Sequence, residues 1–330
     1  PSPRRCGKKR VGGGRGEAEC WRGSCRLAFG PRTRMQSRWQ QSNLAAILRR
    51  LAPVHRMPPG VLFEQVSPYN HVVVRWARGQ LSLCYRHARH RLEEIESRLN
   101  PAEPLALLSE YTRAMLLALA WQPAPRRLLL VGLGGGRLQM VLHHYLERAA
   151  LYTVEIDPVV VDVARRFFGV APDARHHIIV KDGRDYVRGL PPEAPYDMIL
   201  LDAYQVFGIP RHLRTREFYA ECRRCLAPHG AIITNLQRAT PLYHAALKTF
   251  SLAFRHVATF PLRGGNVVAV GSDAEALSPQ EVGERARAVE ARYGFHFALP
   301  RLARAMAPTT PYQLNAPVLS DRDVPGTEIR

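Results

Sequence analysis

A group of glycines and an acidic residue follow two neighbouring apolar runs of the chain. Gly132, Gly134 and Gly136 come directly after the run 127–131, where the pattern changes from a strand to a helix. Residues without a Cβ let backbone amides approach a ligand closely, and a helix N-terminus favours an anionic group. Glu155 ends the next apolar run, where a carboxylate can accept both hydroxyls of a ribose. These residues predict a site for a ligand with an adenosine moiety. NAD is one such ligand, and these residues alone do not distinguish it from the others.

Two further acids follow apolar runs later in the chain, as Asp182-Gly183 and as Asp202-Ala-Tyr204. An acid at the carboxyl edge of one strand can accept from the exocyclic amine of adenine, and an acid on the next strand faces the reacting centre. Taken singly, each acid could instead cap a helix or form a turn, and for Asp182 this alternative weighs as much as adenine binding. Ligand-type residues at four successive strand ends favour a nucleoside-sulfonium site.

Strands and helices alternate with short connections from residue 127 onward, which is the pattern of a parallel sheet. We therefore predict an α/β fold with a doubly wound, mostly parallel seven-stranded sheet. A turn around Gly264-Gly265 predicts an antiparallel pair at its end. The expected strands are 127–131, 151–155, 177–180, 198–201, 231–235, 256–260 and 267–270, and the expected helices are 138–146, 159–168, 217–226 and 242–254.

A smaller unit precedes this sheet. Alternating apolar residues predict three antiparallel strands at 61–66, 72–76 and 81–85, and an apolar helix is expected at 107–121. A helical tail is expected to start at Ser278, with Glu281 completing a capping box. We predict four parts: a disordered Arg/Gly-rich extension (1–34), an N-terminal helix and small β domain (35–100), a Rossmann-like donor-binding catalytic domain (101–275) and a C-terminal helical tail (276–330).

The charge balance of +19 invites a nucleic-acid hypothesis, but its distribution weakens this reading. Residues 1–34 contribute +8 of it, and only four of the 47 cations are Lys. An Arg bias of this kind can arise from a GC-rich genome without selection for binding. The sequence shows no RNA-binding aromatic signature, zinc finger or Lys-rich stripe, so nucleic acid ranks low as a partner.

Other classes are excluded by simple features of the sequence. No run approaches the ~18 apolar residues that a membrane span needs, and the N-terminus lacks the apolar stretch of a secretory signal. We therefore expect a soluble, cytoplasmic protein that does not bind membranes. Six cysteines are too scattered for a disulfide framework, and Cys222 and Cys225 lack a second ligand pair, so we expect no metal.

The motifs resemble the spermidine synthase family of polyamine aminopropyltransferases, which have the class I S-adenosylmethionine-dependent transferase (methyltransferase-like Rossmann) fold. The resemblance includes the β unit and spans roughly residues 60–325. It is carried by Glu64-Gln-Val-Ser-Pro-Tyr69-Asn70, Val131-Gly-Leu-Gly-Gly-Gly136, Val154-Glu-Ile-Asp-Pro158, Lys181-Asp-Gly183, Tyr196-Asp-Met-Ile-Leu-Leu-Asp202, Glu217-Phe-Tyr219, Leu226-Ala-Pro-His-Gly230 and Pro317-Val-Leu-Ser-Asp321.

The resemblance implies roles for the donor-binding residues. The donor would be S-adenosylmethionine or its decarboxylated form, bound as a co-substrate. Glu155 would hold its ribose, and Asp182 and Gly183 would hold its adenine. The loop of Gly132, Gly134 and Gly136 would lie beneath the sulfonium. The candidate catalytic residues near the reacting centre are Asp202, Tyr204 and Gln205: Asp202 as base or amine anchor, and Tyr204 stacking on or hydrogen-bonding the acceptor. His212, on the following loop, is expected to be an ordinary loop histidine.

The chain also departs from the family pattern. Aminopropyltransferases usually carry Asp where this chain has Gly135, and a second Asp, the candidate base, where it has Gln205. The family's loop that contacts the amine usually includes a Tyr-Gln or Tyr-His pair, which aligns with Thr112-Arg113 here. The family's Gln after the tyrosine of the β unit is Asn70 in this chain. An Asp in the glycine loop repels the carboxylate of intact S-adenosylmethionine by about 4 kcal/mol at ~4 Å and an effective dielectric near ~20. Gly135 removes this repulsion, and Arg137 is expected to attract a carboxylate.

From this resemblance we expect a spermidine synthase-like transferase that moves an aminopropyl group from decarboxylated S-adenosylmethionine to a polyamine. Methyl transfer from S-adenosylmethionine to a small acceptor is the first alternative, and a nucleoside-binding protein without catalysis is the second. The expected partner is a small-molecule amine or another small acceptor, and a homodimer is left open.

Overall fold

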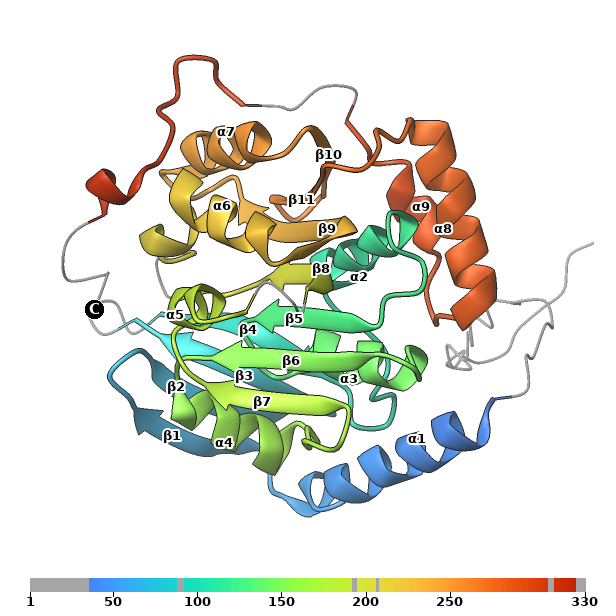
Figure 1. Cartoon of the computed structure of the whole chain (residues 1–330). Coiled ribbons are helices and arrows are strands. Elements are labelled where there is room, and N and C mark those ends of the chain that lie inside the picture. Colours follow the sequence, from blue (N-terminus) through green and yellow to red (C-terminus); the bar gives the residue numbers. More distant parts are fainter. Residues whose placement is uncertain (1–35, 88–91, 192–194, 206–207, 308–311, 325–330) are drawn as a thin grey trace, which may run out of the picture. The chain divides into compact units, whose positions relative to one another are not determined.

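The main sheet of the molecule is doubly wound (Figure 1). The computed structural model describes residues 36–87, 92–191, 195–205, 208–307 and 312–324. Within these ranges the sheet has seven strands in the order β10-β11-β9-β8-β5-β6-β7, and only β11 runs antiparallel to its neighbours. The predicted fold class and the antiparallel final pair are confirmed. The strands are β5 Arg127–Val131, β6 Ala150–Glu155, β7 His176–Val180, β8 Tyr196–Leu201, β9 Leu226–Gln237, β10 His256–Pro261 and β11 Asn266–Ser272.

The strand order places a crevice between β5 and β8. From β5 the chain winds outward through β6 to β7, and it then returns to the other side of β5 with β8. Ligands of open α/β sheets bind at the carboxyl ends of strands where the winding direction reverses. The glycine loop follows β5 and Asp202 follows β8, so both lie at this point.

Both faces of the main sheet are buried, which explains the uninterrupted apolar runs of its strands. In β5, Leu128 and Leu130 belong to a core shared with α3, α8 and the small sheet, whereas Leu129 and Val131 belong to a core with α5, α6 and α7. The α-helices are α1 Arg38–Leu51, α2 Glu110–Met115, α3 Arg137–Tyr145, α4 Pro158–Phe167, α5 Gly183–Arg188, α6 Arg216–Arg224, α7 Tyr243–Ala253, α8 Pro279–Tyr293 and α9 Leu299–Ala303, and the 3-10 turns are η1 Val54–Arg56, η2 Leu116–Ala120, η3 Arg211–Leu213 and η4 Asp321–Asp323.

The small antiparallel sheet has one strand more than the sequence predicted. Its order is β1-β2-β3-β4, with β1 Gly60–Val66, β2 His71–Ala77, β3 Gln80–Arg86 and β4 Glu93–Leu99. The register between β3 and β4 shifts: Leu83 pairs with Ser97 and Cys84 with Ile95. Glu96 is therefore an extra residue on β4, a β-bulge, which re-aims side chains.

Two helical predictions need correction. The apolar segment expected as one helix at 107–121 is α2 followed by the 3-10 turn η2, and the short helix α5 was not expected. The tail helix does begin after Ser278, whose side chain accepts from the N–H of Glu281 in the predicted capping box. The predicted extension at 1–34 lies outside the described residues, and the remaining domain boundaries stay predictions.

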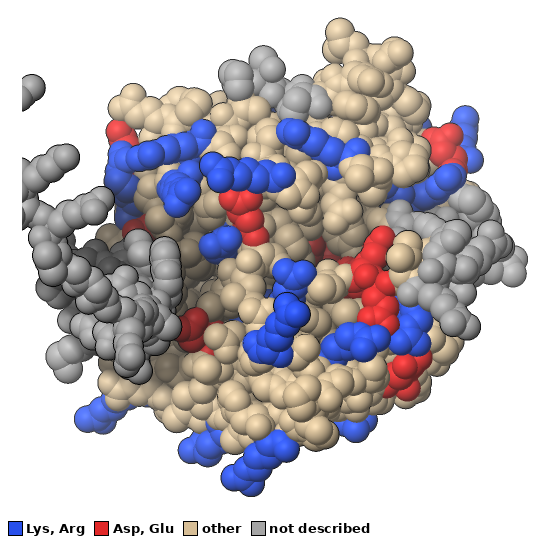
Figure 2. All heavy atoms as spheres, turned by 180° about the vertical axis from the view of Figure 1, so that it is seen from behind, with Lys and Arg blue, Asp and Glu red and all other residues tan. Residues whose placement is uncertain are grey.

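The excess of Arg is dispersed over the surface that Figure 2 shows. Figure 2 shows Lys and Arg spread over one face of the molecule and separated by neutral and acidic side chains, not gathered in a single stripe. None of the helices in the described ranges is long and apolar enough to cross a membrane.

Buried histidines lie where α1 packs on α3 and where β6 meets β7. Asn43 of α1 donates through Nδ2 to Nδ1 of His144, at 3.2 Å. The Nε2 atom of His176 lies 3.1 Å from the Thr153 hydroxyl. Burial lowers the pKa of His144 to about 4 and the pKa of His176 to about 4.

We expect acid to destabilise the fold through these histidines. An unfolded histidine has a pKa of about 6.5, so folding favours the neutral form of these buried histidines. Their contribution to the free energy of unfolding is complete above pH ~6.5 and is lost as the pH falls toward ~4. His144→Gln cannot titrate and should flatten the dependence of the unfolding free energy on pH between ~6.5 and ~4. Denaturant unfolding at several pH values measures this slope. The exposed His229→Gln is the control, and an equal slope in wild type and His144→Gln would contradict the assignment.

Candidate active site

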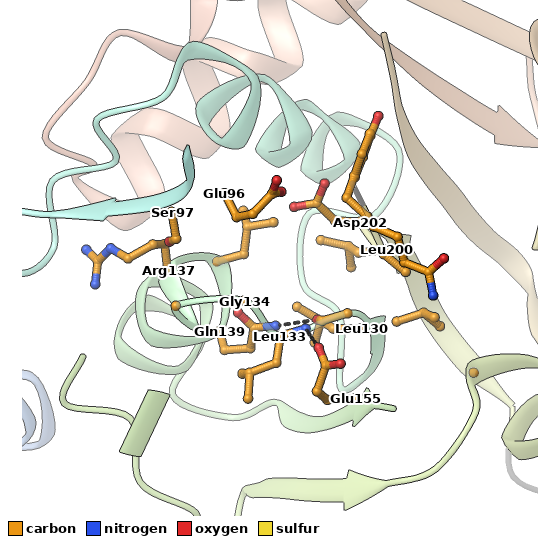
Figure 3. A pocket seen from close by; sticks show the side chains of 18 of the residues that line it. Glu96, Ser97, Leu130, Leu133, Gly134, Arg137, Gln139, Glu155, Leu200 and Asp202 are labelled. Atoms are coloured by element: carbon orange, nitrogen blue, oxygen red, sulfur yellow. Dashed lines mark hydrogen bonds between the residues drawn. The ribbon is translucent and has the colours of Figure 1, made fainter. Parts of the chain in front are cut away.

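A cavity of about 1130 Å³ opens at the carboxyl ends of β5, β6 and β8. Its lining includes every residue that the sequence singled out as a site residue except Gly136, which lies just beneath, at the start of α3. Figure 3 shows the glycine loop and Glu155 on one side of this cavity and Asp202 on another.

The glycine loop depends on glycine for two different reasons. Gly132 has a φ of +100°, and a Cβ there would lie 2.4 Å from the backbone oxygen of Asp202. Gly134 has a φ of +52° but open space where its Cβ would be, and it lines the cavity. Gly132 therefore lets two strand ends approach each other, whereas Gly134 leaves room for a ligand.

Gly135 is also a packing glycine. A Cβ at this position would lie 2.6 Å from the Ser97 hydroxyl and 2.8 Å from Cδ1 of Phe168. The loop thus packs directly against β4, and a carboxylate at position 135 would require β4 to move. The expectation that Arg137 attracts a donor carboxylate is not met: its guanidinium points away from the cavity (Figure 3) and donates to the carbonyl oxygens of Pro104 and Ala106.

Glu155 is fixed by the backbone around it. Oε2 accepts from the N–H of Leu133 at 2.9 Å, and Oε1 accepts from the N–H of Asp157 at 3.0 Å. Burial raises the pKa of Glu155, although these backbone hydrogen bonds act in the opposite direction. Each carboxylate oxygen keeps a further lone pair, as a carboxylate accepting from two ribose hydroxyls requires.

Asp182 caps a helix and also reaches the cavity. Oδ1 accepts from the N–H groups of Arg184 and Asp185 at the start of α5, and Oδ2 lies 2.8 Å from Nε2 of His212. Burial acts to raise the pKa of Asp182, but the His212 contact and the backbone donors leave this pKa below its ordinary value. Asp182 is therefore the N-cap of α5, which was the alternative to adenine binding in the sequence analysis. Asp182 and Gly183 also line the cavity.

Asp202 is held by a network at the reacting centre. Asn235 donates to its Oδ1 at 3.2 Å, Tyr111 hydrogen-bonds to the same carboxylate, and Asn266 donates to Asn235 at 2.9 Å. Burial raises the pKa of Asp202 to about 6, while the Asn235 and Tyr111 hydrogen bonds favour the ionised form. The carboxylate is accordingly ionised near neutral pH.

Tyr204 and Gln205 lie between this cavity and a second cleft. The Tyr204 hydroxyl donates to the backbone oxygen of Asn235 at 2.7 Å, so its ring, not its hydroxyl, is left for an acceptor. The Gln205 backbone pairs with Gly208. Both residues line both cavities, as does Tyr111 of α2, whereas Thr112 lines only the first.

Glu96 is the site residue that sequence reasoning missed. It lines both cavities, and Figure 3 shows its carboxylate turned toward that of Asp202. Burial and the charges of Glu94 and Asp202 raise the pKa of Glu96 to about 8. The sequence signal was the break in alternation on β4, where Ile95 is exposed and the neighbouring Glu96 is turned inward.

The Rossmann-like sheet and the two cavities near the carboxyl ends of its strands define a class of protein, the transferases of class I methyltransferase-like fold. Residues 110–260 match the profile described as the spermine/spermidine synthase domain. A polyamine aminopropyltransferase of Vibrio vulnificus is 30% identical over 234 residues, which cover 69% of this chain and 77% of that relative. The chain belongs to the spermine/spermidine synthase family, and the predicted transferase assignment is confirmed.

Two solved structures show a similar fold. A probable spermidine synthase from Corynebacterium glutamicum covers 80% of this chain and 97% of its own, with a TM-score of 0.60 at 19% identity. The human methyltransferase-like protein 13, in complex with SAH, covers 56% of this chain and 93% of its own, with a TM-score of 0.52 at 27% identity. Both neighbours agree with the class I methyltransferase-like architecture.

We expect Gly134→Ala to weaken nucleoside binding without unfolding the protein. Its Cβ would enter the cavity, and the left-handed backbone adds ~1–2 kcal/mol of strain. Calorimetry with methylthioadenosine, the adenosine part common to both candidate donors, should show at least ~10-fold weaker binding, or ~1.4 kcal/mol. Gly294→Ala is the matched control, because Gly294 also has a positive φ and open space but ends α8. Equal affinities in the two variants would contradict this role.

Proposed function

We propose that the protein transfers an aminopropyl group from decarboxylated S-adenosylmethionine to an amine of the polyamine class. The observation that carries this proposal is the position of the Asp202 carboxylate, which lines the first cavity and is held by Tyr111 and Asn235, two residues that line the second cleft. A carboxylate placed there binds an ammonium next to the sulfonium carbon. Family membership supports the same reaction.

In the proposed complex the donor lies along the glycine loop. Glu155 binds the ribose hydroxyls, and Asp182 and Gly183 meet the adenine. Gly132, Gly134 and Gly136 give the loop its close approach to the sulfonium. The acceptor enters from the second cleft, where Asp202 orients its amine, the Tyr204 ring covers it and Gln205 contributes a neutral amide.

The reaction is an in-line displacement. The acceptor nitrogen donates its lone pair to the carbon next to sulfur, the C–S bond breaks, and its electron pair neutralises the sulfonium to give methylthioadenosine. An ammonium acceptor must first lose one proton, and the product nitrogen keeps the positive charge that Asp202 neutralises. Such a displacement depends mainly on proximity and on a water-poor site.

Methyl transfer from S-adenosylmethionine is the second candidate. Gly135 leaves no carboxylate in the loop to repel the intact donor, and the methyltransferase-like protein 13 resembles this chain at 27% identity. Arg137 does not strengthen this candidate, because its guanidinium is turned away from the cavity. We therefore rank aminopropyl transfer first.

A cytoplasmic location remains part of the proposal, and a homodimer is left open.

Donor binding separates the two candidates. We expect calorimetry to show tighter binding of decarboxylated S-adenosylmethionine than of the intact donor, because the Arg137 guanidinium donates to backbone carbonyl oxygens and is turned away from the cavity. The difference should be at least ~10-fold, or ~1.4 kcal/mol. Methylthioadenosine serves as the control for nucleoside binding alone. A preference for the intact donor would favour methyl transfer.

We expect Asp202→Asn to lose acceptor binding while retaining the donor. The amide keeps its shape but cannot neutralise an ammonium, so kcat/KM for putrescine should fall at least ~100-fold. In the wild type, the decline of kcat/KM with falling pH should steepen below about 6, where Asp202 becomes protonated. Steady-state rates across pH test both points, with the donor KM as the control. An unchanged acid limb in Asp202→Asn would contradict this role.

A further inference from the structure

The second carboxyl at the reacting centre comes from the small sheet. Glu96 lies on the β-bulge of β4 and lines both the donor cavity and the acceptor cleft. Its carboxylate turns toward Asp202, as Figure 3 shows. Gln205, at the same junction, is neutral. Glu96 is therefore a carboxyl at the junction of the two cavities, beside the carboxyl of Asp202.

The two carboxyls differ in their surroundings. Asp202 accepts hydrogen bonds from Asn235 and Tyr111, which stabilise its ionised form. For Glu96, no hydrogen-bond donor is identified among the described residues, and its pKa of about 8 lies above the pKa of about 6 at Asp202. When the environments of two acids separate their pKa values in this way, the lower one holds charge and the higher one takes the proton.

We propose that Glu96 is a catalytic residue of this chain, the base that removes the proton from the acceptor ammonium while Asp202 anchors it. This inference rests on the proposed function. The ammonium passes one proton to a Glu96 carboxylate oxygen and becomes a neutral amine. Its lone pair then forms the N–C bond as the C–S bond breaks toward sulfur. The proton leaves Glu96 for solvent through the acceptor cleft.

Several titratable or charged groups surround Glu96 and set its behaviour. They are Glu94 and Arg98 on β4, Cys84 and Tyr85 on β3, Tyr111 on α2, and Asp202 and Tyr204 after β8, and the cations Arg211 and Arg214 line the same cleft. The tyrosines near the site have pKa values raised well above their ordinary value by burial, so they are neutral near pH 7. Glu96 and Asp202 are thus the groups whose protonation an arriving ammonium changes.

This arrangement predicts that amine binding releases a proton. At pH 7 Glu96 is mostly protonated, and a bound ammonium favours its ionised form, so the proton leaves. Calorimetry of putrescine binding to the protein saturated with methylthioadenosine, in buffers of different ionisation enthalpy, counts the released protons. We expect close to one proton at pH 7 and a smaller number near pH 9.

Variants of β4 assign the released proton. Glu96→Gln should release none and should lower kcat at least ~100-fold at an unchanged donor KM. Glu103→Gln is the matched control, because Glu103 follows β4, is exposed and lines neither cavity, and it should release the proton as the wild type does. Glu96→Asp should recover part of kcat. Thermal unfolding of each variant shows that it is folded.

The outcomes distinguish a failure of the role proposed for Glu96 from a failure of the proposed aminopropyl transfer. If the wild type binds putrescine without proton release, or if Glu96→Gln still releases a proton, Glu96 is not the base, and the proposed function stands. If the wild type binds neither putrescine, spermidine nor propylamine beside methylthioadenosine, the proposed function and this inference both fail.

Discussion

The close packing of the glycine loop is the constraint on which the site depends. At Gly132 the loop meets the backbone of Asp202, and at Gly135 it meets Ser97 of β4, each at a distance that no Cβ could occupy. These contacts join the end of β5 to the end of β8 on one side and to the small sheet on the other. The donor cavity, Asp202 and Glu96 are brought together because the loop has no side chains at these two positions.

The same packing creates the electrostatics of the reacting centre. Burial raises the pKa of both Glu96 and Asp202, and the charges of Glu94 and Asp202 raise the pKa of Glu96 further. Two ionised carboxylates that face each other in a partly buried site raise the free energy of the folded protein, unless a cation binds between them or one of them is protonated. The site is therefore poised for an ammonium, and its affinity for an amine is coupled to the loss of a proton.

The main sheet could be predicted from the sequence because both of its faces are buried. Runs such as 128–131 and 198–201 are apolar throughout, and the glycine loop, Glu155, Asp182 and Asp202 lie at the ends of such strands. β4 could not be predicted in this way, since Glu93, Glu94, Glu96 and Arg98 give it a polar sequence and its bulge breaks the alternation. Glu96 was missed for that reason. The orientation of Arg137 depends on contacts with Pro104 and Ala106, which sequence spacing does not reveal.

The central claim is that an amine attacks the aminopropyl carbon of a decarboxylated sulfonium donor at Asp202. The most direct measurement is mass spectrometry of the products formed from putrescine and each donor in separate reactions. We predict an amine lengthened by one aminopropyl group, together with methylthioadenosine, from the decarboxylated donor. A methylated amine together with S-adenosylhomocysteine, formed from the intact donor alone, would contradict it.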